Sequence, residues 1–117
     1  MTITDIISSL LTPLTVPFYD SPPEFPQSEE MALYIYYTFY STPKLRGGGV
    51  LQAVEYTVTL TVAARNVTRG DALSEQIREL FENNGFVWTG CNYSRDNDFP
   101  RGNLNSMDFK YVIERTI

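Results

Sequence analysis

The sequence predicts an α+β fold, with two helices packed on one face of a mainly antiparallel sheet of four to five strands. Three observations predict this class. Apolar and polar residues alternate over 53–62, apolar residues recur at helical spacing over 68–81, and aromatic and β-branched residues dominate 33–40. Elements that each have one apolar face bury those faces against one another, which gives the two layers of such a domain. At 117 residues the chain is expected to be a single domain over 1–117, with a flexible arm at 41–50 and a polar loop at 94–103.

The first expected element is a helix over 5–11, for which Thr4 is the predicted N-cap. Its apolar stripe consists of Ile6, Ile7, Leu10 and Leu11. Pro13 cannot continue the helix, because it lacks an N–H and its ring clashes with the preceding turn. The run Val16-Pro17-Phe18-Tyr19 is predicted to be a short edge strand, since a strand that contains proline lacks one donor for pairing.

The run from Leu33 to Tyr40 is predicted to be a strand, because it is rich in residue types that favour strands. Its alternation places Leu33, Ile35, Tyr37 and Phe39 on one face and Tyr34, Tyr36, Thr38 and Tyr40 on the other. The second face is amphipathic, so we expect it to be covered by another subunit or half exposed. Residues 41–50 include three consecutive glycines, which favour a mobile hairpin arm. A phosphate-binding loop is not expected there, because no Gly-Lys-Ser/Thr follows the glycines.

The alternation over 53–62 predicts a strand with one buried face. That face carries Val54, Tyr56, Val58, Leu60 and Val62, whereas a glutamate and threonines occupy the other. A helix is then predicted to begin at a capping box formed by Thr68 and Asp71 and to end at Gly85. Its buried stripe consists of Leu73, Ile77, Leu80 and Phe81.

Two further strands are predicted over 86–93 and 104–114, on either side of a polar loop. The inner face of the last strand would carry Met107, Phe109, Tyr111 and Ile113. The loop over 94–103 contains Asp96 and Asp98 near several asparagines, so a cation site is one hypothesis. The central glycine and closing glutamate of a helix-loop-helix calcium site are missing, and a polar hairpin loop is the favoured interpretation.

Composition excludes several kinds of active site. The chain has no His and a single Cys, Cys91, so it can form no Cys–His nucleophile, no Ser–His triad and no histidine metal site. We therefore expect no enzyme activity, no catalytic residue, no cofactor and no bound metal. The net charge of −5 and the scattered Lys and Arg residues argue against ordinary binding to a phosphate backbone.

Two features predict the compartment. A single Cys cannot form an internal disulfide, which is typical of a reducing environment. The first residues lack the basic region of a signal peptide, and no apolar run is long enough to span a membrane. We expect a protein that is made in the cytoplasm and has no membrane contact.

Several segments together form a pattern. They are the helix Ile6-Ile7-Ser8-Ser9-Leu10-Leu11 with Val16-Pro17-Phe18-Tyr19 after it, the aromatic run Tyr34-Ile35-Tyr36-Tyr37, the strand over 56–62, the helix over 73–81, and Met107-Asp108-Phe109-Lys110-Tyr111. Their order resembles that of the tail-completion, or tail-terminator, proteins of long-tailed bacteriophages, which belong to the head–tail joining region. The resemblance covers nearly the whole chain and is a pattern of helices and strands without a chemical signature. The triple glycine and Trp88 have no counterpart in it.

The resemblance implies a structural virion protein that forms a homo-oligomeric ring, expected to be hexameric, at the end of the tail tube. The ring would join the tail tube protein to the head–tail connector proteins, and DNA would pass through its lumen without sequence-specific contact. Such a protein is made in the host cytoplasm and then becomes part of the tail or neck of the virion. The candidate contacts with neighbouring subunits or with the tube are Tyr34, Tyr36, Tyr40, Lys44, Leu45, Arg46, Arg95, Asp96, Asp98, Phe99 and Arg101.

Two other functions stay open at this point. A monomeric or dimeric binding module would use the face of Tyr34, Tyr36 and Tyr40 for a peptide or a small ligand. A divalent-cation-dependent enzyme would use Asp96, Asp98 and nearby carboxylates. Terminator, stopper and other joining proteins are similar in size and composition, so the sequence predicts the joining region rather than one position in it.

Overall fold

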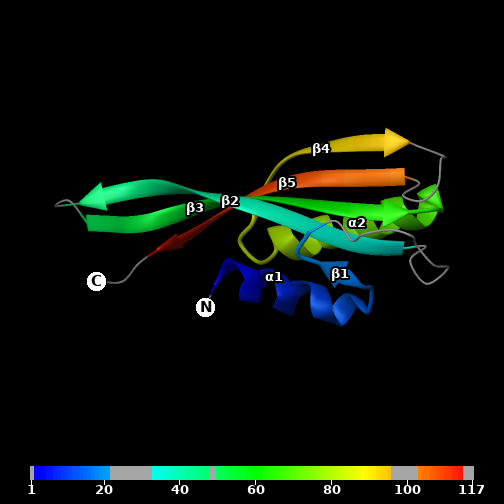
Figure 1. The fold of residues 1–117 in the computed structure, drawn as a ribbon, viewed down its shortest axis with the longest axis horizontal. Coiled ribbons are helices and arrows are strands. Elements are labelled where there is room, and N and C mark those ends of the chain that lie inside the picture. The colour runs from blue at the N-terminus through cyan, green and yellow to red at the C-terminus, as the bar shows by residue number, and fades with distance from the viewer. Residues whose placement is uncertain (1, 22–32, 48–49, 96–102, 115–117) are drawn as a thin grey trace.

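The predicted α+β class is confirmed. The computed structural model of the chain describes residues 2–21, 33–47, 50–95 and 103–114, without the side chains of 44–47, 50–52, 94 and 95. Figure 1 shows two helices and a strongly twisted sheet. In chain order the elements are α1 (Ile3–Leu11), the 3-10 turn η1 (Thr12–Leu14), β1 (Phe18–Tyr19), β2 (Leu33–Gly47), β3 (Val50–Ala64), α2 (Val67–Glu82), β4 (Val87–Arg95) and β5 (Asn103–Glu114).

The sheet contains the strands in the order β1-β2-β3-β5-β4. The four long strands pair in antiparallel fashion, as predicted, whereas β1 lies parallel to β2 and makes the sheet mixed. The predicted short edge strand over 16–19 is confirmed over two residues, Phe18 and Tyr19, which pair with Ile35 and Tyr36. The backbone N–H of Ile35 donates to the carbonyl oxygen of Pro17 at 2.9 Å, so proline supplies an acceptor where it has no donor.

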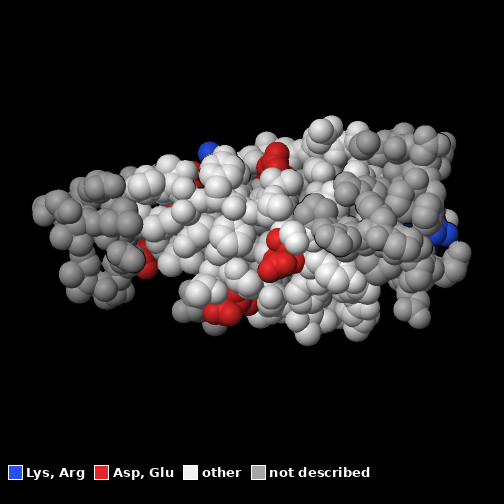
Figure 2. Space-filling view, in the orientation of Figure 1, with Lys and Arg blue, Asp and Glu red and all other residues white. Residues whose placement is uncertain are grey.

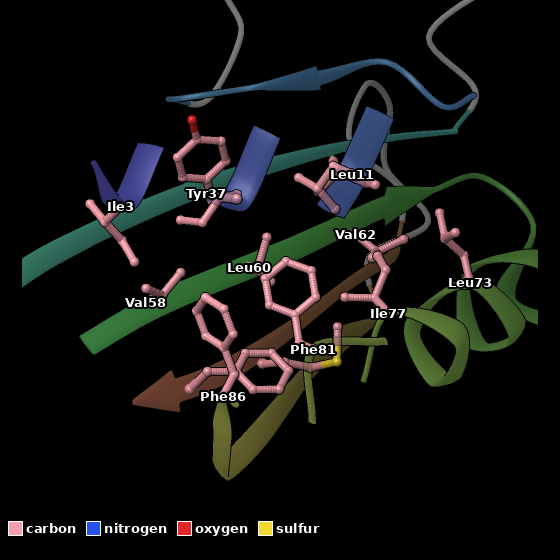
Figure 3. Close-up of a cluster of buried hydrophobic side chains, with 14 residues drawn as sticks. Ile3, Leu11, Tyr37, Val58, Leu60, Val62, Leu73, Ile77, Phe81 and Phe86 are labelled. Carbon is pink, nitrogen blue, oxygen red and sulfur yellow. The ribbon is translucent and has the colours of Figure 1, made fainter. Parts of the chain in front are cut away.

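One face of the sheet builds the core, and the predicted alternation supplies it. Cross-strand register places Tyr37, Leu60 and Met107 in one row and Phe39, Val58 and Phe109 in the next. The helix residues that are buried against this face come from both helices: Ile3, Ile7 and Leu11 from α1, and Leu73, Ile77 and Phe81 from α2. Figure 3 shows these side chains meeting between helices and sheet. The two helices therefore cover the same face.

The predicted N-cap of the first helix is wrong by two residues. Thr2, not Thr4, is the cap: its Oγ1 accepts from the backbone N–H of Asp5 at 3.1 Å, and Asp5 Oδ2 accepts from the N–H of Thr2 at 3.0 Å. These hydrogen bonds lower the pKa of Asp5, chiefly through the backbone N–H of Thr2. Because the helix starts earlier, Ile3 becomes part of the buried stripe. The burial of Ile3 favours Thr2 over Thr4 as the N-cap.

The predicted capping box of the second helix is also wrong. Asn66 is the N-cap, with its Oδ1 accepting from the N–H of Arg69 at 3.1 Å. Thr68 lies inside the first turn of the helix and is therefore not the N-cap. Asp71 Oδ1 accepts instead from Nδ2 of Asn105 on β5 at 2.9 Å. The carboxylate of Asp71, which the local pattern assigned to the cap, therefore makes a tertiary hydrogen bond to β5.

Asn105 joins the start of α2 to the sheet. It is 2% exposed, and its Nδ2 also lies 3.0 Å from Oγ of Ser74, whose hydroxyl donates to the carbonyl oxygen of Gly70 at 2.8 Å. Gly70 permits the helix to approach this closely, because a Cβ there would lie only 2.9 Å from Cβ of Ala64. The network therefore positions α2 on β3 and β5 through polar groups that are paired inside the protein.

Gly85 ends the second helix as predicted. Its φ of +92° is left-handed, and the N–H of Phe86 donates to the carbonyl oxygen of Phe81 at 3.0 Å. This is the Schellman arrangement, which includes an apolar contact between the same two residues. The rings of Phe81 and Phe86 lie 4.8 Å apart, and Phe86 stacks on Tyr111 at 4.3 Å. The turn thus places Phe86 in the core and leads the chain into β4.

The segment predicted as a flexible hairpin arm at 41–50 is mostly paired strand. β2 and β3 continue their ladder from Ser41↔Tyr56 to Gly47↔Val50, with irregular register near Leu45. In Figure 1 these strands run to the left of the helices as a long hairpin, and the molecule measures 53 × 25 × 24 Å. We call 40–47 of β2, 50–57 of β3 and 110–114 of β5 the arm. It protrudes as predicted, but it is built from paired strands.

Replacing Gly85 with alanine is expected to destabilise the subunit. Alanine is strained at this φ, and its Cβ would lie 3.3 Å from Cε1 of Tyr111, so we expect a loss of about 1–2 kcal/mol in the free energy of unfolding. Gly90→Ala is the matched control, because a Cβ there would have no atom within 4 Å. Urea unfolding followed by circular dichroism compares the two, and equal midpoints would contradict the strain.

Asn105→Ala is expected to lower the free energy of unfolding by about 1–3 kcal/mol, since the buried hydroxyl of Ser74 and the carboxylate of Asp71 lose their donor. Asn92→Ala on β4 is the control, because Asn92 is exposed. The same urea experiment measures both variants. An unfolding midpoint for Asn105→Ala that matches the control would show that the network does not hold α2 in place.

Candidate subunit interface

Exposed apolar side chains gather on two strands. Among the described residues, the large hydrophobic side chains that are exposed are Phe39, Tyr40, Val67, Val87, Tyr93 and Val112. Phe39 and Tyr40 lie on β2, and Val87 and Tyr93 lie on β4. Tyr40 and Val87 are the most exposed of the group, at 64% and 62%. Apolar surface that a single domain leaves uncovered in this way is typical of an interaction site.

Both of these strands lie at open edges of the sheet. β4 is the last strand of the sheet, and the parallel strand β1 covers the other side only at Ile35 and Tyr36. Within the described part of the chain, β2 has no strand partner on that side from Tyr37 onward. An open edge presents backbone N–H and C=O groups that can pair with another strand. Open backbone and exposed apolar side chains therefore coincide at both edges.

The predicted tyrosine face is divided by the structure. Tyr34 is 1% exposed and its ring lies 6.3 Å from the rings of both Tyr19 and Tyr36, so it is part of the interior of the subunit. Tyr36 is half-buried, and only Tyr40 is well exposed. Sequence alternation correctly placed the three on one face but did not predict this difference in exposure.

The other predicted contact residues fall at opposite ends of the sheet. Lys44, Leu45 and Arg46 lie in β2 near the tip of the arm, and Arg95 ends β4, paired with Asn103 at the far end. The side chains of these four predicted residues are not described. Asp96, Asp98, Phe99 and Arg101 lie outside the described residues. The structure therefore does not bring the two predicted contact loops together.

The helices are too short to cover the arm. An α-helix of 16 residues such as α2 is about 24 Å long, whereas strands of 15 residues such as β2 and β3 are about 50 Å long. Phe39 marks the boundary: it lies on the face of the core but is 41% exposed, with its ring 6.0 Å from that of Tyr56. The arm continues this face with Val54 and Ile113, which are half-buried. Element lengths were the signal in the sequence that could have located this uncovered surface.

A contact between α2 and β4 holds the open edge strand in place. The guanidinium carbon of Arg78 lies 3.8 Å from the ring centroid of Trp88, and Arg78 Nε donates to Glu82 Oε1 at 2.8 Å. That hydrogen bond, together with the charges of Glu82 and Glu75, raises the pKa of Arg78, so the cation persists over the ring.

A hollow in the surface lies between α2 and β4. A small cavity of about 120 Å³ is lined by Ser74, Glu75, Arg78, Trp88, Cys91, Tyr93 and Met107. A hydrogen bond with Cys91 raises the pKa of Tyr93, and Nε1 of Trp88 is buried without a hydrogen-bond partner among the described residues. Within the described ranges, no three acidic or Cys residues are grouped to hold a metal ion.

Charge on the molecule is dispersed. On the face in Figure 2, the Lys and Arg side chains that the structure describes are not gathered into a patch, and the acidic side chains are scattered. Lys110 lies 3.7 Å from Glu55, and Arg78 is paired with Glu82. In the described part of the chain, no helix is long and apolar enough to cross a membrane.

Comparison with known proteins found no protein-family model and no curated protein that matches the chain.

Arg78→Ala is expected to shift the fluorescence emission of Trp88 to longer wavelength, because water replaces the guanidinium on one face of the ring. Trp88 is the only tryptophan, so its emission reports on this contact. Glu82→Gln is the matched control, since it breaks the ion pair while leaving the arginine over the ring. An emission maximum unchanged in Arg78→Ala would contradict the contact between α2 and β4.

Proposed function

We propose that the chain is a structural subunit that assembles with copies of itself into a ring, which ends the tail tube of a long-tailed bacteriophage and joins it to the head connector. The observation that carries the proposal is the arm. Three strands continue past the helical layer and retain an apolar face that begins with the exposed side chain of Phe39. A subunit that must contact neighbours has a use for such a surface, whereas a solitary domain does not.

A ring is the assembly that this geometry favours. A contact between two different patches repeats from subunit to subunit and ends only when the ring closes. This chain has different exposed patches on β2 with the arm and on β4, at opposite edges of one sheet. Closure would cover both patches in every subunit.

The assignment to a phage tail is supported by the order of elements. The structure has a helix, a short strand, two long strands, a helix and two strands, which is the order in which the sequence resembles tail-terminator proteins. The partners are then the tail tube protein, the connector proteins and the DNA that passes through the lumen. A net charge of −5 supports a lumen that does not grip phosphates. The subunit would be made in the host cytoplasm and become part of the neck of the virion.

A binding module that uses the tyrosine face is less well supported. Tyr34 is buried, so such a site would depend on the half-buried Tyr36 and on Tyr40. The structural role needs no such site.

Phe39→Ser is expected to weaken ring assembly. Burial of the exposed part of one phenylalanine stabilises a contact by about 1 kcal/mol, so the concentration for half-assembly should rise about fivefold or more. Val67→Ser is the matched control, because Val67 is 39% exposed but lies at the start of α2, outside the sheet. Light scattering with negative-stain imaging measures assembly, and circular dichroism verifies that both variants fold.

Assembly of the wild-type chain tests the proposed function itself. We expect rings in solution that bind to the ends of isolated tail tubes. A strict monomer at every concentration, which neither forms rings nor binds tubes, would falsify the proposed function. Normal rings of Phe39→Ser would exclude the exposed side chain of Phe39 from the contact.

A further inference from the structure

We propose that the open edge of β4 pairs with the open part of β2 in a second copy of this chain, so that the sheet continues from one subunit into the next. The contact joins residues 87–91 of one copy with residues 37–40 of its neighbour. The inference rests on the proposed ring and names the contact that would close it.

Strand direction is the first argument. β2 and β5 run one way, and β3 and β4 run the other, because each neighbouring pair among these strands is antiparallel. A copy placed head to tail therefore brings β2 beside β4 in antiparallel orientation, and the alternation of the long strands continues without interruption. Rotation about an axis along the strands repeats this contact and can close it into a ring.

Register is the second argument. Tyr40 pairs with Thr57, Thr57 with Lys110, and Lys110 with Val87, so one cross-strand row of the sheet ends in Tyr40 at one edge and Val87 at the other. These two side chains are the most exposed large hydrophobic groups among the described residues. A neighbour joined without a shift along the strands places Tyr40 opposite Val87. Aromatic and β-branched side chains are favourable cross-strand partners.

The short strand β1 limits the contact. β1 occupies the edge of β2 at Ile35 and Tyr36, so a neighbour can pair only from Tyr37 onward. From Tyr37 onward, a neighbour joined without a shift places Tyr37 opposite Cys91, Thr38 opposite Gly90, Phe39 opposite Trp88, and Tyr40 opposite Val87. The ladder that results has four rows. It buries Tyr40 and Val87, the two most exposed large hydrophobic side chains of the isolated subunit.

The occupant is a second copy because the two edges complement each other within one molecule. Their directions are opposite, their rows coincide, and each ends in an apolar side chain on the same face. A symmetric pairing of two β4 strands would leave Tyr40 and the edge of β2 uncovered. The head-to-tail arrangement covers both edges at once.

Disulfide trapping tests the register. Directly opposed residues of an antiparallel pair have Cα atoms about 4.5–5.5 Å apart, a distance that a disulfide can bridge. In a Cys91→Ser background, which removes the only native cysteine, we expect Tyr40→Cys with Val87→Cys to form covalent oligomers up to the full ring on mild oxidation. Tyr40→Cys with Lys110→Cys is the matched control, because Lys110 is exposed in the same row but lies on β5 between β3 and β4. We expect that control to stay uncrosslinked.

The outcomes separate this contact from the proposed function. Rings of the double-cysteine variant that show no crosslink would overturn the edge pairing and leave the ring standing. Failure of the wild-type chain to assemble at all would overturn the proposed function. Covalent dimers of Val87→Cys alone would indicate pairing of two β4 strands and would overturn the head-to-tail arrangement.

Mixing of edge variants tests the direction. Lysine at an edge opposes strand pairing, so Val87→Lys and Tyr40→Lys are each expected to reduce the ring fraction about tenfold or more, whereas Val67→Lys on α2 should not. Each variant keeps one intact edge, and an equimolar mixture should form 1:1 heterodimers that grow no further. Hydrogen exchange of residues 87–91 should be slow in wild-type rings and fast in Val87→Lys. Rings formed by Tyr40→Lys at the wild-type level would overturn the inference.

Discussion

The difference in length between strands and helices is the constraint on which the rest of this structure depends. Strands of 15 residues reach about 50 Å, and the longer helix reaches about 24 Å, so the helices can cover only part of the sheet. The core under the helices is closed, with Val58, Leu60 and Phe109 fully buried. Beyond Phe39 the same face continues into the arm without a second layer. The helices close the core over one part of the sheet and leave the other part uncovered.

The covered part is also what positions the open edge. Asn105 and Gly70 hold the start of α2 against β3 and β5, and the left-handed Gly85 ends the helix and leads directly into β4. Arg78 then lies over Trp88, one residue after Val87 at the exposed edge. An edge strand that is fixed in this way is pre-organised for pairing, which lowers the entropy lost on association. Assembly would in turn stabilise the subunit by mass action, because the partner binds only the folded state.

Local patterns predicted the elements better than their ends. Alternation over 53–62 correctly identified a strand and its inner face, since side-chain period is a property of the backbone alone. The N-caps were wrong, because several residues near each helix start can accept the same hydrogen bond. The first helix is capped by Thr2 rather than Thr4, and this earlier start allows Ile3 to be buried. Asp71, which was predicted for the capping box of the second helix, accepts a hydrogen bond from Asn105. The glycines at 47–49 predicted a mobile hairpin arm, and strand pairing continues to Gly47.

The sequence by itself determined the fold class, the inner face of each long strand and the exclusion of histidine chemistry, because these depend on residue type and local period. Tertiary structure alone decided which residues of a face are exposed. Tyr34 and Tyr40 share one face of β2, yet one is buried and the other is 64% exposed. It also decided that Val87 and Tyr40 end the same row at opposite edges of the sheet. Exposure and strand order depend on which segments become neighbours. Contacts between segments that are distant in sequence produce no local periodicity, so the sequence pattern does not predict them.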